Sequence, residues 1–136
     1  MITKMTHTNV YVLDLDKALD FYTQVLGFEV RIDQVFGEYR WVTVGLKSNP
    51  ELELVLSPIT TQMFRDEETV ASIKALVAKG AFSGPVLACE DIYATYEELK
   101  GKGVEFTKEP TEEFYKTEAV FKDNSGNWFS LGESKG

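Results

Sequence analysis

The alternation of apolar and polar side chains predicts a strand at the start of the chain. Residues 5–13 alternate around β-branched and aromatic side chains, which is typical of a half-buried strand. Asp14 suits the N-cap of a following helix with apolar positions at helical spacing, and Gly27 suits its C-cap. Turn-like segments then separate three further predicted strands, at 28–35, 39–46 and 52–57.

The same order of elements returns in the second half. A helix that opens at Asp66 and closes at Gly80 is predicted as a connector. After it we expect a strand, a helix capped by Glu90 or Asp91, and three more strands; the four strand ranges are 82–89, 104–107, 117–122 and 128–132. Pro85 has no N–H for a strand ladder, so it must lie at an edge or a bulge.

The two halves therefore predict a tandem duplication of a β-α-β-β-β unit. Leu26-Gly27-Phe28-Glu29-Val30 matches Lys102-Gly103-Val104-Glu105-Phe106 at the junction between helix and second strand. We predict one α+β domain over residues 1–136. It would consist of two βαβββ modules, at about 4–58 and 81–134, joined by a helical connector at 59–80.

Charge and composition narrow the possible partners. The chain has 14 Lys and Arg against 22 Asp and Glu, a formal charge of −8, so nucleic acid is not expected as a partner. The chain has no apolar run long enough to span a membrane and no signal-peptide pattern at Met1, and its single cysteine cannot form an internal disulfide. We expect a cytoplasmic protein with no membrane partner.

The segment HTNVYVLDLDKALDFYTQVLGF, residues 7–28, resembles the opening of the vicinal oxygen chelate superfamily. This superfamily includes glyoxalase I, the bleomycin-resistance proteins and the extradiol dioxygenases. The segment FKDNSGNWF, residues 121–129, is similar to the family's final hairpin. The resemblance implies two modules that curl mixed sheets around a cleft, with helices on the outer face, and commonly a homodimer.

The resemblance also implies four positions for one divalent metal ion, two from each module. In the first module these positions hold His7 and Glu53, which are competent ligands. Applying the repeat offset, the second module supplies Gly84 and Ser130, which offer no strong ligand. We therefore expect no metal or other cofactor. The alternative is a divalent metal held by His7 and Glu53, and a misregistered alignment would also change this comparison.

Side-chain alternation predicts which residues face the cleft. In the strand at 52–57 the leucines can pack on a helix while Glu53 points the other way. In the first strand Thr8, Val10 and Val12 share one side. The residues expected to line a ligand-binding cleft are His7, Asn9, Tyr11, Arg40, Trp41, Glu53, Trp128 and Ser130.

Two classes of function remain open from the sequence. The first is a protein that binds a small cationic or aromatic molecule without a metal, because aromatic side chains are abundant and a negative field attracts cations. The second is a metal-dependent lyase, isomerase or dioxygenase that uses His7 and Glu53. Core packing for Trp41 and Trp128, and a surface ion pair for Arg40, are the structural alternatives.

Overall fold

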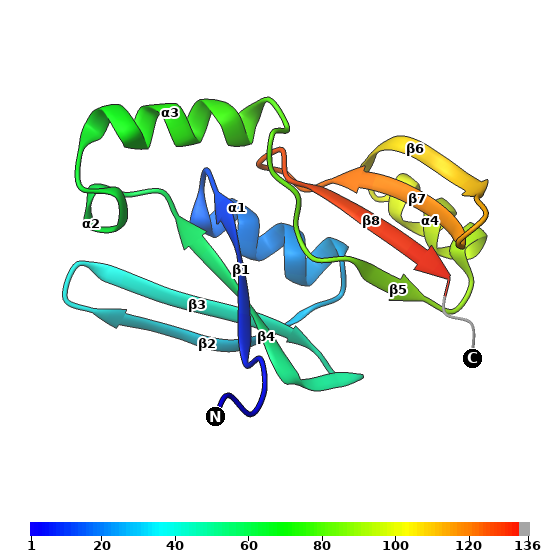
Figure 1. Cartoon of the computed structure of the whole chain (residues 1–136), viewed down its shortest axis with the longest axis horizontal. Coiled ribbons are helices and arrows are strands. Elements are labelled where there is room, and N and C mark those ends of the chain that lie inside the picture. Colours follow the sequence, from blue (N-terminus) through cyan, green and yellow to red (C-terminus); the bar gives the residue numbers. More distant parts are fainter. Residues whose placement is uncertain (134–136) are drawn as a thin grey trace.

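The structure, a computed structural model, describes residues 1–133 and consists of two four-stranded mixed sheets with helices (Figure 1). The first module contains β1 (His7–Val12), α1 (Leu15–Asp20), the π-helical segment η1 (Phe21–Val25), β2 (Glu29–Phe36), β3 (Tyr39–Leu46) and β4 (Asn49–Pro58). The predicted end of the second module, at residue 134, lies outside the described residues.

The connector and the second module follow in the same manner. The connector holds α2 (Thr61–Phe64) and α3 (Glu67–Ala78). The second module contains β5 (Leu87–Cys89), α4 (Ile92–Gly101), β6 (Glu105–Glu112), β7 (Thr117–Lys122) and β8 (Trp128–Glu133). The short helix α2 was not predicted, because its segment shows no long apolar periodicity.

The strand order confirms the predicted α+β fold. The first sheet has the order β1-β4-β3-β2 and the second has the order β5-β8-β7-β6. In both sheets the first strand of the module pairs in parallel with the last strand, and the other pairs are antiparallel. The two modules therefore have the same topology, as a tandem duplication requires.

Three aspartates cap the predicted helices through their side chains. Asp14 accepts a hydrogen bond from the backbone N–H of Lys17, and Asp66 accepts one from Thr69. Asp91, rather than Glu90, caps α4 by accepting from the N–H of Ala94. Each bond satisfies one of the backbone donors left unpaired in a first helical turn.

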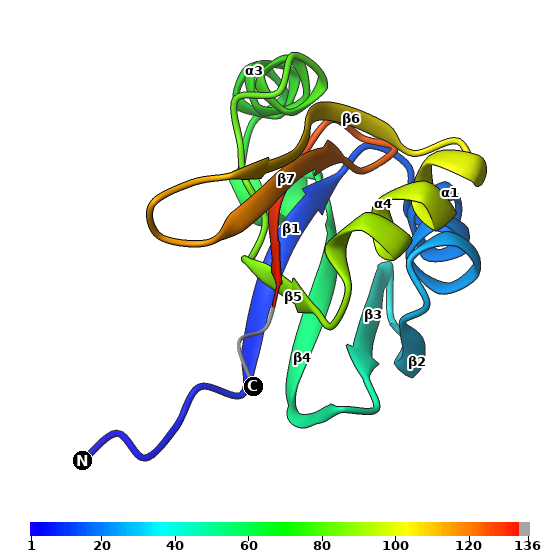
Figure 2. The same cartoon turned by 90° about the vertical axis from the view of Figure 1, so that its right-hand side faces the viewer.

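One hydrophobic core joins the two modules through the helix-covered faces of both sheets. Tyr22 of η1 is fully buried, and its ring contacts Phe129 of β8 at 6.1 Å between centroids. Its hydroxyl donates a hydrogen bond of 2.6 Å to Asp123. In Figure 2 both α1 and α4 lie on one side of β1. The opposite face of each sheet is therefore turned away from the shared core.

The strand predicted at 82–89 is shorter than expected. Only Leu87–Cys89 forms regular pairs with β8, and an isolated bridge joins Ser83 to Trp128. Between them, a Cβ on Gly84 would approach the ring of Phe129 to 2.3 Å, so this backbone lies directly against the core. Pro85 lies in this irregular stretch, in agreement with its missing N–H.

The strand predicted at 104–107 is longer than expected, because β6 continues to Glu112. Pro110 lies within it, where the pairing register shifts between Lys108 and Thr111. Since β6 is the edge strand of its sheet, a proline at the shift costs little pairing. The sequence pattern missed this extension because charged residues and a proline at an edge do not look like a buried strand.

Candidate functional site

Polar and aromatic side chains gather on the face of the first sheet that is turned away from α1. We call this the first open face and define it by His7, Asn9, Tyr11, Tyr39, Trp41, Thr43 and Glu53. On the other side of β1 and β4, Val10, Leu54 and Leu56 are buried in the core. The predicted alternation of these two strands is confirmed, and Leu52 is half-buried at the edge of the core.

Glu53 is held in place by a neutral donor. The hydroxyl of Thr43, which is fully buried, donates a hydrogen bond of 2.6 Å to Oε1 of Glu53. Oε2 of Glu53 lies 4.0 Å from Nε2 of His7, which is too long for a hydrogen bond. His7 is itself oriented by a bond of 2.8 Å between Nδ1 and the hydroxyl of Thr6.

Aromatic rings line two neighbouring hollows on the first open face. One is open to solvent and is lined by His7, Thr8, Asn9, Tyr11, Tyr39, Trp41, Val55, Ser57 and Met63. The other is lined by Ile32, Gln34, Phe36, Tyr39 and Trp41. Tyr39 and Trp41 belong to both hollows, and their ring centroids lie 6.4 Å apart. The two hollows are therefore adjacent on one face of the sheet, and we call them together the aromatic trough.

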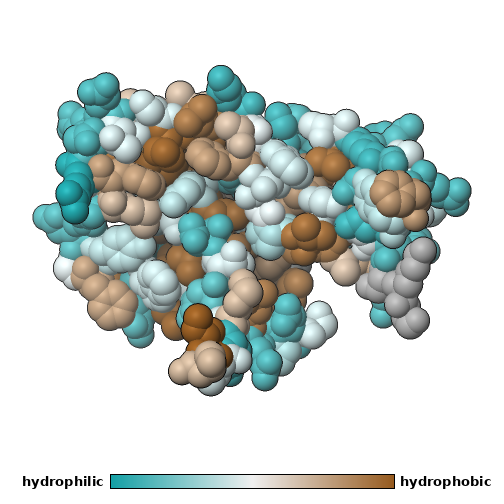
Figure 3. All heavy atoms as spheres, viewed as in Figure 1, coloured by the Kyte–Doolittle hydropathy of each residue, from teal (hydrophilic) through white to brown (hydrophobic). Residues whose placement is uncertain are grey.

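The surface around α2 and the β2–β3 hairpin has a mixed character. In the view of Figure 3, brown apolar side chains lie there beside pale and teal ones. Met63 of α2 lines the trough, and Phe64 contacts Tyr11 edge-on at 5.5 Å. The short helix thus forms one end of the trough, a contribution that periodicity in the sequence did not reveal.

Arg40 does not join this group. It lies on the opposite face of β3, where its guanidinium bonds Asp33 of β2 at 2.9 Å and Asp16 of α1 at 2.5 Å. These two carboxylates raise the pKa of Arg40 above its ordinary value. The expectation of a cleft arginine is corrected in favour of an ion pair between sheet and helix, because adjacent strand positions face opposite sides.

Ser130 and Trp128 lie on the corresponding face of the second sheet, which we call the second open face and define by Lys108, Lys116, Glu118, Trp128 and Ser130. The Ser130 hydroxyl donates to Oε2 of Glu118, and Nζ of Lys116 lies 3.3 Å from the same hydroxyl. Trp128 is 39% exposed at the start of β8. These two residues are therefore not brought together with His7 and Glu53 within one chain.

Glu118 is the carboxylate of this second face, and several donors surround it. Besides Ser130, it accepts hydrogen bonds from Nζ of Lys108 at 2.9 Å and from the hydroxyl of Tyr115 at 2.8 Å. These bonds, led by the one from Ser130, lower the pKa of Glu118 from 4.5 to about 2. The sequence comparison missed Glu118 because it lies on β7, not on either strand that carries the family's ligand positions.

Each open face carries a hydroxyl that donates a hydrogen bond to an acid, but the strands that carry the hydroxyl and the acid are exchanged between the two modules. In the first module the hydroxyl of Thr43 on β3 donates to the acid Glu53 on β4. In the second module the hydroxyl of Ser130 on β8 donates to the acid Glu118 on β7. Thr43 pairs with the residue two positions after Glu53, and Glu118 pairs with the residue two positions after Ser130. Ser130 is thus the structural counterpart of Glu53.

The described residues do not fit a divalent metal of the kind the family uses. Gly84 is not the counterpart of His7, because a side chain there would enter the ring of Phe129 and not an open face. Glu118 is already bonded to Lys108 and two hydroxyls. Within residues 1–133, no three His, Cys, Asp or Glu side chains gather where they could hold an ion. His7 and Glu53 alone are fewer ligands than a catalytic metal normally takes.

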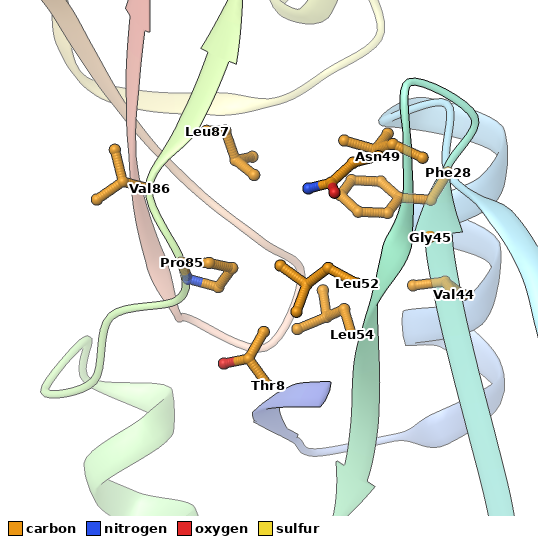
Figure 4. Close-up of a pocket in the computed structure, with 11 residues that line it drawn as sticks. Thr8, Phe28, Val44, Gly45, Asn49, Leu52, Leu54, Pro85, Val86 and Leu87 are labelled. Atoms are coloured by element: carbon orange, nitrogen blue, oxygen red, sulfur yellow. The ribbon is translucent and has the colours of Figure 1, made fainter. Parts of the chain in front are cut away.

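A separate apolar crevice lies between the modules on the core side. Pro85, Val86 and Leu87 line one wall, and Leu52, Leu54 and Phe28 line the other, with Thr8 and Asn49 at its margins (Figure 4). It contains no ionisable side chain. The sequence did not predict this crevice, because it depends on how the modules pack against each other.

Two βαβββ units, each with its first and last strands paired in parallel, define the class of fold, and comparison with known proteins identifies the family. Residues 4–131 match the Glyoxalase/Bleomycin resistance protein/Dioxygenase superfamily. The chain belongs to this superfamily, as the sequence motifs predicted.

Relatives within the superfamily are of more than one kind. The crystal structure of UcmS2 is 49% identical, with a TM-score of 0.93, and the match covers 98% of this chain and 100% of that one. TnmS3, described as an antibiotic binding protein from Streptomyces sp. CB03234, is 27% identical with a TM-score of 0.77 and 98% coverage of both chains. A probable lactoylglutathione lyase from Synechocystis sp. is 30% identical over 78% of this chain and 75% of its own length.

No helix among residues 1–133 has the length and apolar character needed to cross a membrane.

Proposed function

We propose that this protein binds a small aromatic molecule in the aromatic trough and does so without a metal. The observation that carries the proposal is that two adjacent hollows share the rings of Tyr39 and Trp41, next to the polar side chains of His7 and Glu53. Flat rings stack well on exposed aromatic side chains, and a few polar groups beside them orient the ligand. The similarity to an antibiotic binding protein supports this reading.

We further propose that a second copy of the chain completes the site, which makes the protein a homodimer. Because the helix-covered faces of both sheets share one core, the two open faces do not face each other within one chain. The aromatic trough therefore has no second wall of its own. In a dimer, the second open face of one copy would cover the trough of the other and bring its Ser130 and Trp128 to the ligand.

The second candidate function is a metal-dependent lyase of the same superfamily. It is favoured by relatives described as probable lactoylglutathione lyases and by the presence of His7 and Glu53. The shortage of further ligands on either open face weighs against it. We also propose a cytoplasmic location for the protein under either function, since a single cysteine suits a reducing compartment.

Fluorescence titration with planar tricyclic molecules tests the binding proposal. Quenching of Trp41 should saturate at micromolar ligand in protein treated with a chelator, and Trp41→Leu should weaken binding at least ten-fold. Tyr93→Leu is the matched control, because Tyr93 is an aromatic residue 54% exposed on α4. Unchanged binding by Trp41→Leu would refute the assignment of the trough.

A thermal-shift experiment separates the two candidate functions. Ni²⁺, Zn²⁺, Mn²⁺ or Fe²⁺ near stoichiometric concentration should hardly change the melting temperature, since a site at its Kd gains only about 0.4 kcal/mol. A tight site at 100 times its Kd would gain about 2.7 kcal/mol. A large shift that is lost in His7→Ala would favour the lyase. Light scattering tests the dimer, and a mass of 15.4 kDa that persists on concentrating would refute it.

A further inference from the structure

We infer that the ligand of the aromatic trough carries a positive charge, which pairs with Glu53. This inference rests on the proposed function and adds the chemical class of the ligand: a flat, multi-ring molecule that carries one cationic nitrogen group. It follows from the bonding of the carboxylates on the two open faces, from the rings beside Glu53, and from the shape of the trough.

Glu53 retains acceptor capacity for a further hydrogen bond. A carboxylate accepts through two oxygens. Among residues 1–133, the side chain of Glu53 accepts one hydrogen bond, at Oε1, and its donor is the neutral hydroxyl of Thr43. The side chain of Glu53 is 25% exposed, and no hydrogen bond within residues 1–133 reaches its Oε2.

Glu118 differs from Glu53 in its partners. That carboxylate is paired with the ammonium group of Lys108 and is bonded through both oxygens. Its charge is neutralised within its own module. The described residues place no lysine or arginine within 4.0 Å of Glu53, whose nearest basic group is the imidazole of His7. Within one copy of the chain, Glu53 is the one of the two related acids that is not paired with a lysine or arginine.

Aromatic rings lie near the carboxylate of Glu53. The ring of Trp41 lies 6.1 Å from the ring of His7, and Tyr39 continues the same wall. A cation beside Glu53 would thus also lie near electron-rich ring faces, which attract cations. The overall charge of −8 acts in the same direction by raising the local concentration of cationic ligands.

The trough also indicates the size of the ligand. From the polar end at His7 it passes Tyr39 and Trp41 and continues to the apolar hollow lined by Ile32 and Phe36. A single ring would fill one hollow only. A ligand that uses both hollows needs more than one ring, with its cationic group facing the His7 end.

Three tricyclic probes of similar shape test the charge preference at pH 8. They are 9-aminoacridine, which is cationic, acridine, which is neutral, and anthracene-9-carboxylate, which is anionic. We expect the cation to bind at least ten-fold more tightly than the neutral probe, which is about 1.4 kcal/mol. The anion should bind most weakly. Quenching of tryptophan fluorescence gives each Kd.

Glu53→Gln should abolish the preference while retaining binding of neutral acridine, because its amide oxygen can still accept from Thr43. Glu105→Gln is the matched control. It makes the same change in net charge at an acid that is 68% exposed on β6, and it should keep the preference. If Glu53→Gln fails to fold, the wild-type protein provides a second measurement, in which added NaCl should shrink the difference between cation and neutral probe.

The outcomes separate the two levels of the proposal. Equal affinities for all three probes, or a preference that survives in Glu53→Gln, would overturn the role of Glu53 while leaving the trough as the binding site. Failure of every probe to bind would refute the proposed function itself.

Discussion

Tyr22→Phe should separate the hydrogen bond that joins the two modules from the ring packing around it. The change removes only the hydroxyl, which donates to Oδ2 of Asp123 at 2.6 Å in a fully buried position. Burial, and then the charge of Asp123, raise the pKa of Tyr22 well above its ordinary value. The hydroxyl therefore remains a donor throughout the neutral range. The contacts of its ring with Phe28 and Phe129 should persist in the variant.

The size of the expected loss of stability depends on the hydrogen bonds that Asp123 keeps in the variant. A hydrogen bond to a charged partner contributes about 1.5–3 kcal/mol. After the change, Oδ1 still accepts from the backbone N–H groups of Ser125, Gly126 and Asn127, each at 2.9 Å, and Oδ2 still accepts from the amide of Asn127. Because the carboxylate remains well bonded, we expect the lower part of the range, about 1.5–2 kcal/mol.

Urea denaturation at pH 7 measures this loss, and a calorimetric scan should show a fall in Tm of roughly 5–10 °C. Tyr115→Phe is the matched control. Its hydroxyl also donates to a carboxylate, that of Glu118, but the residue is 48% exposed, so water can replace the lost bond. It should cost less than about 1 kcal/mol. Equal losses in the two variants would refute the claim that burial at the contact between modules sets the energy.

Two further predictions concern the sheets. Leu54→Ala should destabilise the protein by about 2–5 kcal/mol, as expected for a buried leucine. Glu53→Gln should cost less than about 1 kcal/mol, because the acceptor for Thr43 is retained. Chemical denaturation that ranked the two variants in the other order would contradict the assigned faces. For Glu118, whose pKa is lowered in the folded state from 4.5 to about 2, the unfolded chain binds the proton first. The contribution of Glu118 to the free energy of unfolding is complete above about pH 4.5 and is lost as the pH falls towards 2. In urea titrations, Glu118→Gln should therefore lose less stability than the wild type between pH 5 and pH 3. An identical loss in both proteins would show that other carboxylates govern acid unfolding.

The comparison of ligand positions between the modules shows where sequence reasoning failed. A constant sequence offset between the two modules matched Gly84 to His7. By that alignment, a histidine introduced at position 84 would restore a metal ligand. In the structure, a side chain at Gly84 would collide with Phe129, so Gly84→His would disrupt the core instead. The repeat slips in the irregular stretch before β5, where one module bulges and the other does not. A one-residue slip is enough to reverse the face of a strand residue.

The sequence by itself determined the elements, their order and the duplication. Helical and two-residue periodicities are local properties, so the caps at Asp14, Asp66 and Asp91 and the inward side of β4 could be predicted from neighbouring residues. The resemblance to the family, and not local periodicity, placed His7 and Glu53 together, and the parallel pairing of β1 with β4 at these two residues agrees with it.

Only the tertiary structure decided which of the candidate residues share a surface. Arg40 and Trp41 are neighbours in sequence but lie on opposite faces of β3, and Ser130 lies on a different sheet from Glu53. The pairing of Glu118 with Lys108 and Ser130, which leaves Glu53 as the acid without a cation, depends on contacts between β6, β7 and β8. Such contacts arise from strand register and from the packing of the modules through Tyr22. No local pattern encodes them, because they join residues that are distant along the chain.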